Sequence, residues 1–176
     1  ERRQSAPVNR MTLMWADFRE PAIEHLPSLT KPAADTEQYL KDVEDNYIND
    51  AYHSLSIEGY QVSHEMIERV RSGEWAPDLS EDDRHQSDAL AARGYYQAVQ
   101  SVKGSVRKVL QGENAGDVVA HDHGDWYREL FGPSVQAGIL RPGDLAGYRN
   151  GPVYIRNSKH VPPQRDVVRD LMPAFF

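Results

Sequence analysis

The sequence has no cysteine and no long hydrophobic run, and each absence narrows what the protein can be. Without cysteine, the chain can form neither a disulfide framework nor a thiolate metal site. No stretch approaches the ~18 consecutive apolar residues that a membrane-spanning helix needs, so we expect no membrane partner. The first ten residues contain neither Met nor the apolar segment of a secretory signal. We therefore expect a cytoplasmic location.

Positive charge is also scarce. The 176 residues include 20 Lys and Arg against 27 Asp and Glu, which gives a formal charge of −7 at pH 7. This acidic balance argues against a nucleic-acid partner, because phosphate binding relies on Lys and Arg. The length fits one domain with a core. Because the chain starts at Glu1 and ends in Phe175 and Phe176, we expect a piece of a longer protein, and the apolar end could favour a homo-oligomer.

Proline density separates an N-terminal arm, residues 1–34, from a helical part, residues 35–176. Four prolines in the arm permit at most one short helix, near residues 11–20; they are Pro7, Pro21, Pro27 and Pro32. We expect an extended arm that docks onto the body through Leu13, Trp15 and Phe18.

From residue 35 onward, apolar residues recur at steps of three and four, the spacing of amphipathic helices. The first predicted helix covers about 36–58, with Asp35 or Thr36 as its N-cap and Gly59 just after its end. Further helices are predicted over about 64–71, 81–110, 126–131 and 167–175, with a polar loop over 112–124. The fold class is therefore mainly α.

One segment has strand character. Residues 148–149 and 153–155 flank Asn150-Gly151, a two-residue turn typical of a β-hairpin. Pro152 cannot donate a ladder hydrogen bond, so the second strand should lie at an edge. An exposed edge can accept an extended peptide as an added strand. The alternative is a small hairpin with no function of its own.

The end of the first predicted helix carries a hydroxyl and a carboxylate on one face. Ser54 and Glu58 are four residues apart, and Gly59 follows. In the last turn the helix dipole disfavours an anion by a few tenths to ~1 kcal/mol, so Glu58 would gain from a cationic partner. The alternative is a solvated acid in front of a glycine cap.

These two segments, in this order, resemble the Fic (Fic/DOC) family of nucleotidyltransferases. Ser54, Glu58 and Gly59 match every fixed position of the family's inhibitory motif, (S/T)xxxE(G/N). Residues 137–163 resemble the stretch ahead of the family's active site and end in His160-Val161-Pro162-Pro163. The resemblance covers residues 35–176. It implies an incomplete Fic-like helical bundle, with an inhibitory helix about 36–58, a long helix about 81–110 and a β-hairpin flap about 147–161.

The resemblance also implies roles for the matched residues. Glu58 would be the autoinhibitory glutamate, which pairs with an Arg of the active site and occupies the space of the ATP γ-phosphate. The flap would hold a target's modifiable side chain in register by strand pairing, through Pro152, Val153, Tyr154, Ile155, Arg156 and His160. The parent enzyme would transfer AMP from ATP, with Mg²⁺, to a hydroxyl side chain of a protein, and the target protein is left open.

The chain departs from the family at its catalytic signature, HxFx(D/E)GNGR. The sequence contains no Gly-Asn-Gly-Arg run and no His after His160. We therefore assign no catalytic residue to this chain. We expect the chain alone to be inactive and to bind neither ATP nor a metal.

Two other interpretations stay open. In the first, the chain is an antitoxin-like helical module that inserts Glu58 into a separate Fic chain. In the second, it is a metal-dependent hydrolase that uses His121, His123 and Asp125, because imidazole and carboxylate groups bind divalent metals. Asp125 could instead cap the helix predicted to begin at Trp126.

Overall fold

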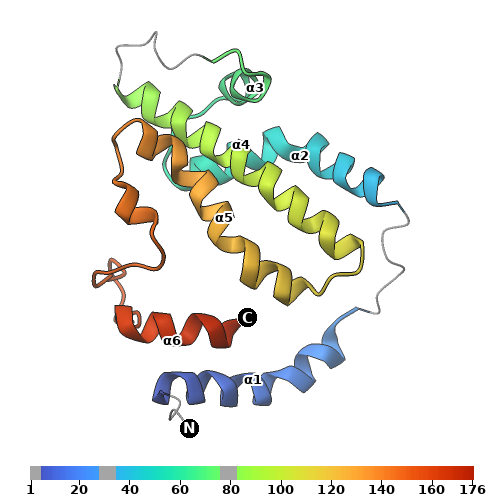
Figure 1. Ribbon diagram of the computed structural model, residues 1–176, viewed down its shortest axis with the longest axis vertical. Coiled ribbons are helices and arrows are strands. Elements are labelled where there is room, and N and C mark those ends of the chain that lie inside the picture. The colour runs from blue at the N-terminus through green and yellow to red at the C-terminus, as the bar shows by residue number, and fades with distance from the viewer. Residues whose placement is uncertain (1–4, 28–34, 76–82) are drawn as a thin grey trace. The chain divides into compact units, whose positions relative to one another are not determined.

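The computed structural model describes residues 5–27, 35–75 and 83–176, and these residues form helices and loops with no β-strand among them (Figure 1). The mainly α class is therefore confirmed. The chain divides into two compact units, one of residues 33–146 and one of residues 1–32 with 147–176. Within the described ranges, no helix combines the length and apolarity needed to cross a bilayer.

In the larger unit the described residues form four α-helices and a short 3₁₀ helix: α2 (Thr36–Ile57), α3 (His64–Ser72), α4 (Asp83–Leu110), α5 (Ala115–Gln136) and η2 (Pro142–Leu145). Figure 1 shows α4 and α5 side by side as an antiparallel pair. Helices α2 and α3 contact each other, and both pack on α4. The long helix α4 is therefore the element on which the unit is assembled.

Helix α2 begins and ends where its capping residues predict. The Asp35 carboxylate accepts hydrogen bonds from the backbone N–H groups of Glu37, at 2.9 Å, and Gln38, at 3.4 Å. These bonds satisfy two of the donors that every helix start leaves unpaired. At the other end Gly59 has a φ of +91°, the left-handed conformation that glycine adopts without strain.

Among the described residues, the core of this unit includes two clusters of buried side chains between α2, α3 and α4. The first contains Tyr47, Ala51 and Ile67, and the second contains Leu55, Val70 and Ala92. Tyr95 of α4 packs against both clusters. The buried residues of α2 are Leu40, Tyr47, Ala51 and Leu55, which follow one another at steps of seven, four and four, so the stripe expected from the sequence is the face that packs.

Helix α5 corrects two predictions. The expected polar loop over 112–124 and short helix over 126–131 are wrong, because one continuous helix runs from Ala115 to Gln136. Asn114 starts it by accepting hydrogen bonds from Gly116 N, at 2.8 Å, and Asp117 N, at 3.2 Å. Packing against α4 then carries the helix through Gly124, Gly132 and Pro133, which sequence reasoning treats as breakers.

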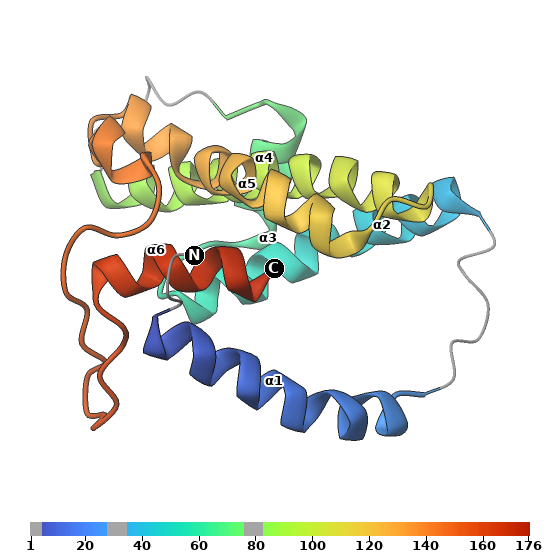
Figure 2. The same cartoon turned by 60° about the horizontal axis from the view of Figure 1, so that its bottom comes forward.

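The smaller unit contains α1 (Ala6–His25) and α6 (Arg165–Phe175), which lie side by side in Figure 2. Helix α1 is 20 residues long, so the prediction of an extended arm with a short helix is wrong for residues 6–25. Pro7 is tolerated because it lies in the first turn, where its missing N–H has no helical partner anyway. Leu13, Trp15 and Phe18 have exposed side chains, and their docking stays a prediction.

The predicted β-hairpin is also wrong: residues 147–161 form turns and irregular backbone without strand pairing. A hairpin of this kind needs positive φ at both turn residues. In this segment positive φ occurs at Gly147 and Asn157, not at Asn150 and Gly151. Arg149 stabilises the segment instead, since its guanidinium donates to the carbonyls of Gly151, at 3.0 Å, and Pro163.

Candidate functional site

The C-terminal end of α2 fixes the backbone at Glu58, the C-cap residue of the helix. Gly59 N donates to Ser56 O at 3.0 Å, and Tyr60 N donates to Leu55 O at 3.0 Å. These two bonds define a Schellman motif, and the side chains of Leu55 and Tyr60 meet in the second core cluster, as such motifs favour. The glutamate singled out by the sequence therefore sits at a well-defined helix end.

A cavity of about 620 Å³ lies at this helix end, within the larger unit. Residues of α2, α4 and α5 and of the turn after α2 line it: Ser54, Leu55, Ile57, Glu58, Tyr60, Ala91, Tyr95, Leu130, Phe131 and Ser134. Two of the three predicted inhibitory residues, Ser54 and Glu58, thus face one space. The third, Gly59, contributes the helix ending and is not part of the lining.

The chemistry of this lining is acidic and aromatic. Glu58 is its one ionisable carboxylate, and the lining residues named above include no Lys, Arg or His. Tyr60, Tyr95 and Phe131 add aromatic rings. The Glu58 side chain is exposed, and among the described residues it has no hydrogen-bond or ion-pair partner. A carboxylate beside aromatic rings suits a guanidinium or ammonium group.

The same lining does not fit a nucleotide. Polyphosphates are bound by Lys and Arg, by Mg²⁺ or by the free N–H groups at the start of a helix. This cavity instead lies at the C-terminal end of α2, and the charged group there is the Glu58 carboxylate. Among the described residues, no group of three or more His, Asp or Glu side chains is arranged to hold a metal ion. ATP and Mg²⁺ are therefore not assigned to this cavity.

Tyr95 connects the cavity wall to α2. Its hydroxyl lies 2.6 Å from Asp50 Oδ2 and 3.2 Å from Ser54 Oγ. Partial burial and the neighbouring Asp50 carboxylate raise the pKa of Tyr95 above its ordinary value, so the phenol stays protonated. The sequence pattern alone did not indicate this contact, because nothing local links Tyr95 to a residue 41 positions away.

The flap residues lie in the smaller unit, and the structure brings some of them together. A cavity of about 390 Å³ is bordered by Pro152, Val153 and Tyr154 and by residues 161–166. Ile155, Arg156 and His160 are exposed and are not part of this border. Asn150 ties the segment to α6, since its side-chain oxygen accepts from Arg169 at 2.7 Å.

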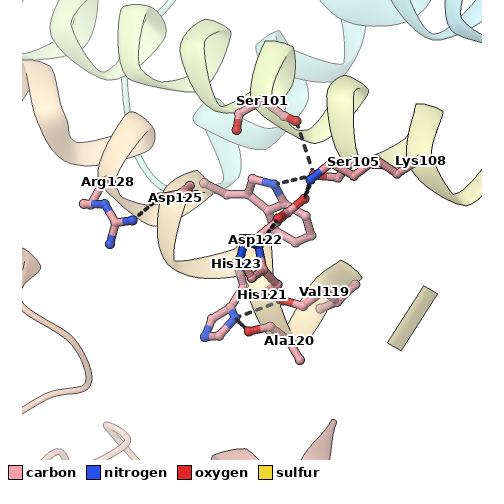
Figure 3. Close-up of polar contacts among 11 residues, drawn as sticks. Ser101, Ser105, Lys108, Val119, Ala120, His121, Asp122, His123, Asp125 and Arg128 are labelled. Carbon is pink, nitrogen blue, oxygen red and sulfur yellow. Dashed lines mark hydrogen bonds and ion pairs between the residues drawn. The ribbon is translucent and has the colours of Figure 1, made fainter. Parts of the chain in front are cut away.

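The candidate metal ligands do not converge. The run from His121 to Asp125 lies inside α5, where residues two apart point about 200° away from each other. Figure 3 shows Asp122 directed at α4, where it accepts from Ser105 at 2.6 Å and from Lys108 at 2.8 Å. His123 turns to the carbonyls of Val119 and Ala120 in its own helix.

Asp122 is therefore part of a polar network between α4 and α5. Trp126 donates to Ser105 Oγ at 3.1 Å, and His121 Nδ1 lies 2.7 Å from the other carboxylate oxygen. Hydrogen bonds from Lys108, Ser105 and His121 hold the pKa of Asp122 well below its ordinary value. Asp122 and His121 therefore contribute to the packing of α5 on α4. This arrangement does not support the metal-dependent hydrolase interpretation.

Comparison of the chain with protein-family models, with curated proteins and with solved structures finds no match in any of the three.

Proposed function

We propose that this chain carries the regulatory and target-docking part of a Fic-type protein adenylyltransferase, in which Glu58 restrains AMP transfer. The observation that carries the proposal is the position of Glu58, at the fixed end of α2 and beside a cavity whose described lining contains no basic residue. A carboxylate in this position is a suitable partner for an Arg supplied by another segment or chain. The motif Ser54 to Gly59, followed far along the chain by His160-Val161-Pro162-Pro163, supports the same assignment.

The restraint arises from competition for charge and space. The carboxylate of Glu58 pairs with an Arg of the catalytic signature and stands where the terminal phosphate of a nucleotide would lie, so it repels that phosphate. An anion at a helix C-terminus is disfavoured by about 0.3–1 kcal/mol, and pairing with a guanidinium offsets this cost. ATP and Mg²⁺ belong to the active site that contains the signature, and the proposed compartment is the cytoplasm.

Residues 147–161 form the target-docking segment in this proposal. Val153, Tyr154 and Ile155 have exposed side chains, at 46%, 75% and 50% of their full accessible area. Their backbone is not paired with a strand of the described chain. In this proposal the segment becomes extended only on docking, when a peptide of the target pairs with it, and Tyr154 contacts the target side chain.

The chain alone tests where the chemistry resides. We expect no labelled AMP on any protein when the 176-residue chain is incubated with α-labelled ATP and Mg²⁺, because it has no HxFx(D/E)GNGR signature. Transfer by this chain would contradict the assignment of the active site to another segment or chain.

The coding sequence after the codon for Phe176 separates two versions of the proposal. If it encodes the signature, Glu58 acts within one polypeptide. If it contains a stop codon and a separate Fic chain binds this one, the chain is an antitoxin-like module. The proposal is wrong if the signature does not follow and no Fic chain binds.

A further inference from the structure

We infer that Tyr95 is the positioning residue for Glu58: its hydroxyl ties the last turns of α2 to α4 and so sets where the Glu58 carboxylate stands in the cavity. This inference rests on the proposed function of Glu58. The contact itself does not depend on that function, which allows the two to be tested separately.

The hydrogen bonds of Tyr95 have a defined direction. A carboxylate only accepts, so the single hydroxyl proton of Tyr95 goes to Asp50 Oδ2 across 2.6 Å. The Ser54 hydroxyl then donates to the Tyr95 oxygen across 3.2 Å. Asp50, Ser54 and Glu58 follow at intervals of four, so their side chains lie on one face at the end of α2. Asp50 and Ser54 contact the Tyr95 hydroxyl, and Glu58 faces the cavity.

The ring of Tyr95 makes the hydroxyl a fixed point. It packs against both core clusters, and its centroid lies 6.4 Å from that of the buried Tyr47 ring. Since the ring cannot shift without disturbing that core, Asp50 and Ser54 can keep their hydrogen bonds only in the present rotation of α2. Because the Schellman motif fixes the backbone of residues 58–60 to the last turn of α2, the rotation of the helix also determines the position of Glu58.

Two variants separate positioning from general stability. Tyr95→Phe keeps the ring and removes both hydrogen bonds, and Tyr96→Phe is its control, because the described residues provide no hydrogen bond to the Tyr96 hydroxyl. Asp50→Ala removes the acceptor at an exposed position, so it keeps the inference testable if Tyr95→Phe does not fold. Asp45→Ala, an exposed acid of the same helix, is the control for that second variant.

Amide hydrogen exchange on the 176-residue chain is the first measurement. We expect Tyr95→Phe and Asp50→Ala to speed exchange at residues 58–60 about 2- to 10-fold, the factor by which one net hydrogen bond changes an equilibrium. The amides of Gly73 and Glu74 close the equivalent motif at the end of α3 and should not change. Unchanged exchange at 58–60, or an equal increase at 73–74, would overturn the inference.

AMP transfer by the enzyme that contains the catalytic signature, either the complete gene product or a separate Fic chain bound to this one, is the second measurement. We expect Tyr95→Phe to raise transfer in part, and the double variant with Glu58→Gly to be no more active than Glu58→Gly alone, because both act through one carboxylate. If Glu58→Gly has no effect, the proposed function fails while the exchange result stands. If Glu58→Gly activates but Tyr95→Phe changes neither exchange nor transfer, the positioning role alone is wrong.

Discussion

Gly94 of α4 packs directly on the backbone of Leu130 in α5. A Cβ atom at position 94 would overlap the Leu130 carbonyl oxygen and lie 2.8 Å from the carbonyl carbon. The two helices can approach this closely only because residue 94 has no side chain. Since Tyr95 follows Gly94, and Leu130 and Phe131 line the cavity beside Glu58, this contact also fixes two walls of the candidate site.

We therefore expect Gly94→Ala to destabilise the protein by about 1–3 kcal/mol or more, because a backbone carbonyl cannot move aside as a side chain can. Gly104→Ala is the matched control in the same helix. A Cβ atom at position 104 would meet no atom within 4 Å, so the higher helix propensity of alanine should stabilise the protein by about 0.5–1 kcal/mol. Urea unfolding of both variants measures the difference. Equal effects of the two changes would contradict the close packing of α4 on α5.

Tyr47 offers a second test of the core. Its ring is 2% exposed, and its buried hydroxyl has no hydrogen-bond partner among the described residues. A buried hydroxyl without a partner costs about 1–3 kcal/mol, so Tyr47→Phe should leave stability unchanged or raise it by about 1 kcal/mol. Thermal unfolding measures this, with Tyr96→Phe as the neighbouring control. A marked loss of stability would show that the Tyr47 hydroxyl has a partner after all.

The Asp122 network predicts a dependence of stability on pH. Its donors hold the pKa of the folded carboxyl below the ordinary value of 3.8, so the unfolded chain binds more protons than the folded protein between these two values. The contribution of Asp122 is therefore complete above the ordinary value and decreases as the pH falls through and below 3.8. Unfolding free energies measured across this range should show that decrease in the wild-type protein.

Asp122→Asn removes the titrating group and should flatten that part of the pH profile. The stability difference between wild type and variant should be largest near neutral pH and should shrink in acid. Asp45→Asn, an exposed acid in α2, controls for general charge effects. A difference between wild type and Asp122→Asn that stays constant down to low pH would contradict the proposed network.

Sequence reasoning succeeded where local signals decide the structure. The cap Asp35 and the glycine Gly59 mark the bounds of α2, because each acts within three or four residues of itself. The motif that ends at Gly59 is local in the same sense. The position of the motif at a helix end could therefore be predicted from the sequence, whereas the cavity beside it could not.

The remaining features depend on contacts between distant segments. Helix α5 continues past Gly132 and Pro133 because one of its faces packs on α4. Local helix propensity cannot predict that packing. The hairpin prediction relied on Asn150-Gly151 without knowing their φ angles, and arginine-to-carbonyl bonds hold the segment instead. The role of Tyr95 is visible only once α2 and α4 lie together.

AMP transfer by the enzyme that contains the catalytic signature, either the complete gene product or a separate Fic chain bound to this one, tests the central claim most directly when measured with and without Glu58→Gly. The measurement uses α-labelled ATP and counts label on protein, with Glu113→Gly, an exposed acid in the loop between α4 and α5, as control. We predict that Glu58→Gly raises transfer about 5- to 150-fold, the range of a coupling free energy of 1–3 kcal/mol, and that Glu113→Gly does not. Equal transfer with and without Glu58, or no transfer from ATP by either protein, would contradict the account.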